Sequence, residues 1–91
     1  SPVLEQNELQ QMRIAGDSLI DAYNVETNTD IKAALFRDVI DKSLEIVKIS
    51  KAEEDMNRTE SLLRRAIESR LISYPEFRAY NDSLRLYMRE K

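Results

Sequence analysis

The sequence predicts an all-α protein of three or four amphipathic helices, arranged as antiparallel helical hairpins or as a bundle built on a long central helix. Three observations lead to this prediction. Apolar residues recur at spacings of three and four along most of the chain. One glycine and two prolines in 91 residues are too few for the many tight turns of a β-rich fold. Two short breaks separate the periodic stretches, and the length corresponds to a single helical domain over residues 1–91.

We expect the first helix over residues 2–23. Ser1 and Pro2 form a start signal, with serine as the N-cap and proline at the first helical position. One apolar face follows, formed by Leu9, Met12, Ala15, Leu19, Ala22 and Tyr23. Gly16 lies inside this helix at a cost of about 1 kcal/mol relative to alanine. It is either a tolerated glycine or a point where a second helix approaches closely.

The polar segment 24–30 ends the first helix, and Asn28 or Thr29 caps the second. We expect the second helix over residues 30–72. Its middle part is poor in apolar residues but contains no glycine or proline, which favours a continuous helix. The alternative is a break near residue 56, where Asn57 and Glu60 match a capping box.

The last helix is expected over residues 75–90. Pro75 disfavours a helical conformation at the preceding residue, and Ser73 with Glu76 matches a capping box. The apolar face of this helix consists of Phe77, Tyr80, Leu84 and Tyr87. If the central helix is continuous, the chain forms a Z-shaped pair of hairpins; if it breaks, four helices can close into a bundle.

The second helix carries two apolar stripes that lie side by side. The first consists of Ile31, Ala34, Leu35, Val39, Ile46 and Ile49, and the second of Phe36, Ile40, Leu44 and Val47. One neighbouring helix shields about one stripe, and each large side chain left in water forgoes about 1.5–3 kcal/mol of burial. We therefore expect self-association, as a homodimer or a higher oligomer, through Ile31, Leu35, Phe36, Val39, Ile40, Leu44, Ile46 and Val47. In the closed bundle, residues 57–72 and 76–90 would cover the second stripe instead.

The residue types argue against catalysis. The chain has no cysteine and no histidine, so it lacks disulfides, thiolate ligands and the commonest general base. Asp38, Asp41 and Glu45 share a helix face on which oxygen ligands could hold a divalent cation, but a solvated helix face is the favoured interpretation. We expect no enzymatic activity, no cofactor and no metal.

The net charge and the hydropathy of the chain argue against nucleic acid and membranes as partners. The net charge of −3 disfavours nucleic acid, although Arg64, Arg65 and Arg70 could form a small basic patch. No apolar run approaches the ~20 residues of a membrane span, so we expect no membrane. The absence of cysteine fits a cytoplasmic location.

These observations favour a non-enzymatic protein–protein interaction or assembly module that self-associates through its helices. The alternative is a small helical regulator or inhibitor that docks onto one target protein. Residues 10–56 also resemble the oligomerisation hairpin of phage small terminases, in having an amphipathic helix, a short polar turn and a second long helix. That resemblance, which no specific motif carries, implies an oligomeric packaging or structural subunit.

Overall fold

The structure, a computed structural model, describes residues 2–90 and confirms the all-α class: these residues form four helices and no strand. The helices are α1 (Pro2–Val25), α2 (Thr29–Ser50), α3 (Glu53–Glu68) and α4 (Tyr74–Arg89). The predicted N-cap, Ser1, lies outside the described residues.

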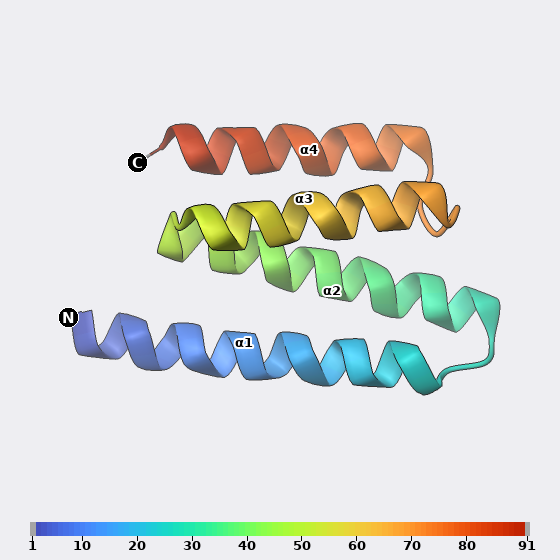
Figure 1. The fold of residues 1–91 in the computed structure, drawn as a ribbon, viewed down its shortest axis with the longest axis horizontal. Coiled ribbons are helices and arrows are strands. Elements are labelled where there is room, and N and C mark those ends of the chain that lie inside the picture. The colour runs from blue at the N-terminus through green and yellow to red at the C-terminus, as the bar shows by residue number, and fades with distance from the viewer. Residues whose placement is uncertain (1, 91) are drawn as a thin grey trace.

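Consecutive helices run antiparallel and form a flat molecule of 41 × 25 × 15 Å (Figure 1). The central helix α2 packs against each of the other three helices, whereas α1 packs against α2 alone. Two ion pairs connect α1 to α3: Arg13 reaches Asp55 at 2.8 Å, and Asp17 reaches Arg58 at 3.2 Å. The molecule is therefore a three-helix unit, α2–α4, with α1 laid against its edge.

The connection between α1 and α2 follows the predicted chemistry. The helix α1 extends two residues beyond the predicted end. Asn28 has extended backbone angles, and its side-chain oxygen accepts a hydrogen bond from the backbone N–H of Ile31 at 3.1 Å. Asp30 lies in the first turn of α2, where a carboxylate interacts favourably with the helix dipole.

The continuous helix predicted over residues 30–72 is wrong, because the chain reverses at Lys51 and Ala52. Lys51 takes the left-handed conformation, with φ of 54°. Its ammonium donates to the carbonyl oxygen of Tyr87 in α4 at 2.6 Å. The Ser50 hydroxyl accepts from the Ala52 N–H at 3.2 Å and donates to Asp55 at 2.7 Å. The break lies before residue 56, and contacts with other helices help to hold it.

The helix α3 ends at Glu68, four residues before the predicted end. Its termination is a Schellman motif, in which Leu71 N–H donates to the carbonyl of Ala66 and Arg70 N–H to that of Ile67. Glycine is the usual residue at the left-handed position of this motif, but here it is Arg70, with φ of 58°. Because the end has no glycine signal, the sequence pattern placed it too late.

A capping box opens α4 as predicted, although the helix begins one residue early, at Tyr74. The Ser73 hydroxyl accepts from Glu76 N–H at 3.3 Å, and the Glu76 carboxylate accepts from Ser73 N–H at 2.9 Å. The same carboxylate accepts two hydrogen bonds from Arg37 of α2, at 2.7 and 3.0 Å. One glutamate thus caps α4 and ties its start to α2.

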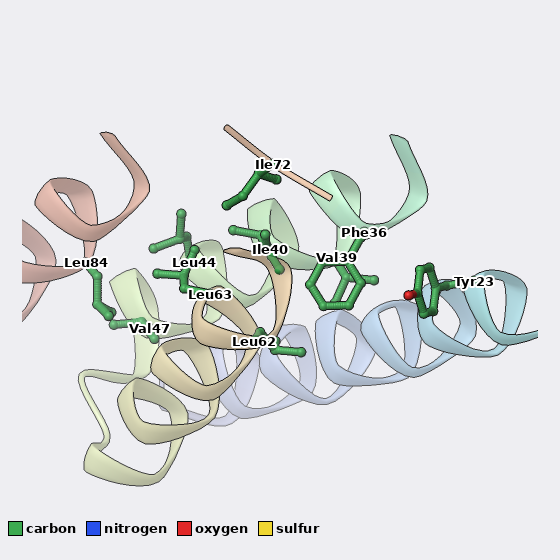
Figure 2. Close-up of a cluster of buried hydrophobic side chains, with 11 residues drawn as sticks. Tyr23, Phe36, Val39, Ile40, Leu44, Val47, Leu62, Leu63, Ile72 and Leu84 are labelled. Carbon is green, nitrogen blue, oxygen red and sulfur yellow. The ribbon is translucent and has the colours of Figure 1, made fainter. Parts of the chain in front are cut away.

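The core confirms the closed bundle and excludes the Z-shaped alternative. Side chains of α3 and α4 cover the second stripe of α2, so Phe36, Ile40 and Val47 are almost fully buried (Figure 2). Tyr23 of α1 closes one end of this core by packing edge-on against Phe36, with ring centroids 5.1 Å apart.

Candidate protein-interaction site

Most of the interface predicted on the second helix lies inside the chain. Six of the eight residues are buried in this single copy: Phe36, Val39, Ile40, Leu44, Ile46 and Val47. Leu35 is half-buried, and Ile31 is 48% exposed. Self-association through α2 was predicted because its second apolar stripe lacked a covering helix. In the structure, α3 and α4 cover that stripe. Self-association itself stays a prediction.

The structure also places the carboxylate face of α2 and the arginines of the predicted basic patch. Burial raises the pKa of Asp41, and the nearby charges of Asp38 and Glu45 raise it further. Within residues 2–90, no group of three or more histidine, cysteine, aspartate or glutamate side chains is placed to hold a metal ion. Two arginines of the predicted basic patch lie in different environments. Arg65 lies 5.6 Å from the ring centroids of Tyr23 and Phe36. Arg64 lines a groove between α3 and α4.

That groove is a concave surface with a volume of about 760 Å³. One wall comes from α3 and the other from α4. Its apolar lining consists of Met56, Leu63, Phe77, Leu84 and Met88. Its polar lining consists of Glu60, Arg64, Asn81, Asp82, Arg85 and Arg89.

The groove exists because α4 is only partly covered. Among residues 74–89, Leu84 alone is buried. Phe77 and Met88 are half-buried beside it, although both pack against the core cluster. Leu63 of α3 is buried below them. The floor of the groove is therefore apolar. Its half-buried side chains, Phe77 and Met88, retain exposed surface that a partner can cover.

The rim of the groove is charged, and its positive charges outnumber its negative charges. Three guanidiniums, of Arg64, Arg85 and Arg89, accompany the carboxylates of Glu60 and Asp82. All five side chains are exposed. None of them takes part in an ion pair within the part of the chain that the structure describes. The arginines are thus available to carboxylates of a partner, with which they can form paired hydrogen bonds.

The shape of the groove suits an elongated ligand. The lining residues of α4 extend from Phe77 to Arg89, about 18 Å at ~1.5 Å per residue. Two antiparallel helices with a channel between them offer the ridges and grooves that a third helix packs against. The sequence pattern predicts a core face that contains Phe77 and Leu84, but it does not predict the groove. The available signal was the run of arginines at Arg85 and Arg89, one turn apart beside that face.

No described helix is both long and apolar enough to cross a bilayer, as judged over residues 2–90. Comparison with known proteins found no matching family model, no matching curated protein and no matching solved structure.

Proposed function

We propose that this chain is a non-enzymatic protein-binding module whose α3–α4 groove receives an amphipathic helix of a partner protein. The observation that carries the proposal is the combination of an apolar floor with three arginines that form no ion pair within residues 2–90. Helix-in-groove recognition uses these elements: an apolar face fills the floor, and charges at the rim select the partner. A cytoplasmic location stays the prediction that accompanies this function.

The charges of the rim favour an acidic partner over a basic one. Three guanidiniums against two carboxylates leave an excess of one positive charge. A helix that flanks its apolar face with glutamate or aspartate places carboxylates near Arg64, Arg85 and Arg89. A helix flanked by lysine meets like charges at the same positions, which reduces its affinity. We therefore expect an acidic amphipathic helix as the ligand.

Two synthetic helical peptides test this function. They share a leucine-rich face and differ in carrying glutamate or lysine beside it. Fluorescence anisotropy is expected to show that the glutamate peptide binds the wild-type chain about tenfold more tightly, a difference of ~1.4 kcal/mol. The double charge reversal Arg85→Glu with Arg89→Glu is expected to invert the preference.

A matched control comes from the same helix. Arg78 is exposed on α4 but does not line the groove, so Arg78→Glu is expected to leave the preference unchanged. Circular dichroism confirms that each variant keeps its helices. Failure of both peptides to bind would contradict the proposal, as would an equal loss of preference in the Arg78 variant, which would indicate a general charge effect.

A further inference from the structure

The outer face of α1, away from α2, carries exposed apolar side chains. Figure 1 shows α1 at one edge of the molecule, and it packs against α2 alone. Four large apolar side chains of α1 are exposed: Val3, Leu4, Ile14 and Val25, at 65%, 67%, 51% and 80%. Three of them, Val3, Ile14 and Val25, recur every eleven residues. At 3.6 residues per turn, these three positions fall on one side of the helix. They are spaced about 16 Å apart at ~1.5 Å per residue, and with the residues between them they define a row along one side of α1.

The residues between these three complete the row with few charges. Asn7, Gln10, Ser18 and Asp21 lie on the same side of the helix, and all four are exposed. Asp21 is the one charged residue of the seven, in a chain in which 34% of residues are charged. The charged residues Arg13 and Asp17 point to α3 instead, where they form ion pairs. Depletion of charge on an exposed face is characteristic of the centre of an interface.

The row is also symmetric about its middle. Val3 and Val25 lie eleven residues on either side of Ile14. An antiparallel pair of α1 helices centred on Ile14 therefore sets Val3 of one copy against Val25 of the other. The same register sets Asn7 against Asp21 and Gln10 against Ser18. In both polar pairs a side chain that can donate a hydrogen bond faces one that can accept it. A two-fold axis requires this kind of self-complementarity.

We propose that the chain forms a homodimer in which the outer faces of two α1 helices pack antiparallel, with Ile14 on the two-fold axis. The occupant of this face is a second copy of the same chain, because the row is complementary to itself. A parallel pair would place Asp21 against Asp21, which is repulsive, and would align the two helix dipoles. The antiparallel pair avoids both. This interface uses neither the α3–α4 groove nor the buried stripes of α2, so it does not depend on the proposed function.

The strength of the dimer follows from its size. A single pair of helices with one apolar side chain per three turns is smaller than a standard protein interface. The dimer is accordingly weak and depends on concentration.

Cysteine cross-linking tests the geometry, because the chain contains no cysteine of its own. Ile14→Cys places a thiol opposite its own copy and is expected to give a covalent dimer under mild oxidation. Val3→Cys and Val25→Cys are each expected to stay uncoupled, whereas the double variant Val3→Cys with Val25→Cys is expected to cross-link. Leu86→Cys is the control, since Leu86 is 46% exposed on α4 and outside the row. Coupling of Val3→Cys alone, as readily as Ile14→Cys, would overturn the antiparallel arrangement.

Sedimentation equilibrium tests the association without any cross-link. The wild-type chain is expected to change from the mass of one chain towards that of two as concentration rises. Ile14→Arg is expected to remove this change, since it places two guanidiniums on the axis. Leu86→Arg, the matched control, is expected to keep it. The mass of a single chain at every concentration would overturn the proposal, as would equal weakening by both substitutions. The groove variants Arg85→Glu and Arg89→Glu are expected to leave the dimer intact, so the two proposals fail separately.

Discussion

The hydroxyl of Ser43 on α2 lies 2.6 Å from the hydroxyl of Thr59 on α3, and both side chains are buried. Thr59 also donates to the carbonyl oxygen of Asp55 at 2.8 Å. A threonine hydroxyl has one proton, so Ser43 is the donor in the bond between the helices. The pair is a polar contact within an apolar interface, in which each hydroxyl depends on the other.

Removing both members of this pair is expected to cost less free energy of unfolding than the sum of the two single removals. Thr59→Val keeps the shape of the side chain but leaves the Ser43 hydroxyl buried without its acceptor, at a cost of about 1–3 kcal/mol in the free energy of unfolding. The double variant Ser43→Ala with Thr59→Val is expected to be less destabilised than the sum of the single variants. Urea unfolding of the four proteins gives the coupling energy directly. Strict additivity would contradict an energetic role for the bond.

The stability of the chain is expected to fall in acid partly through Glu76. Hydrogen bonds from Arg37 and then from the backbone N–H of Ser73 lower the pKa of Glu76 from 4.5 to about 2. The ionised carboxylate therefore stabilises the fold above the unfolded-state pKa, and this contribution is lost as the pH falls from about 4.5 towards 2. Both partners are about one-third exposed, so the effect stays below about 1 kcal/mol.

Glu76→Gln isolates this contribution, because glutamine can still accept the capping bond from Ser73. Urea unfolding is expected to show the variant less stable than wild type at neutral pH and equal to it near pH 2. Glu8→Gln, at an exposed position of α1, serves as the control and is expected to have no comparable effect. A stability difference that does not change with pH would contradict the ionic origin.

Gly16 is expected to tolerate alanine with a gain in stability. A Cβ atom built at Gly16 would lie 3.7 Å from the side chain of Lys42, an ordinary van der Waals distance. Gly16→Ala should therefore raise the free energy of unfolding by about 1 kcal/mol through helix propensity. Ala15→Gly, at the exposed neighbouring position, is expected to lower it by a similar amount. Destabilisation by Gly16→Ala would instead support the close helix approach that the sequence left open.

The two left-handed residues are expected to respond differently to glycine. Arg70→Gly relieves the strain of a side chain in this conformation, and we expect a gain of about 0.5–1 kcal/mol. Lys51→Gly relieves the same strain but loses the hydrogen bond from Lys51 to the Tyr87 carbonyl, so its gain is expected to be smaller or absent. Lys51→Ala keeps the strain and measures the lost bond alone. Thermal unfolding distinguishes the three, and equal gains from both glycine variants would contradict a role for the Lys51 contact.

Local chemistry was sufficient to predict the helical class, the first and last helices, and two of the three breaks. The Asn28 cap and the Ser73–Glu76 capping box each involve residues three positions apart, so each could be recognised without knowing the fold. The turn at Lys51 could not be located in this way. It depends on Tyr87 and Arg13, which are distant in the sequence. One local feature did indicate a helix start after the turn. Residues 53–55 are glutamate, glutamate and aspartate, a composition typical of a first helical turn.

The reversal at Lys51, which the continuous helix left out, also explains why most residues of the predicted interface lie in the core. With residues 30–72 as one helix, no segment of the same chain would reach the stripe that contains Ile40 and Val47. The reversal at Lys51 brings α3 back onto that stripe, so the residues with the strongest apolar pattern became core. The surfaces that remain outside, on α1 and α4, have weaker patterns that are visible once the buried faces are known.

The left-handed conformation of Lys51 decides whether this chain encloses its own core. Neither Lys51 nor Ala52 is a glycine or proline, and with right-handed torsions α2 and α3 would fuse into a rod about 60 Å long. Two such rods, side by side, could exchange their C-terminal halves and rebuild each core from both chains, with the same contacts as in one. In the structure, the Arg13–Asp55 ion pair and the hydrogen bonds of Ser50 and Lys51 hold the chain in the self-contained arrangement.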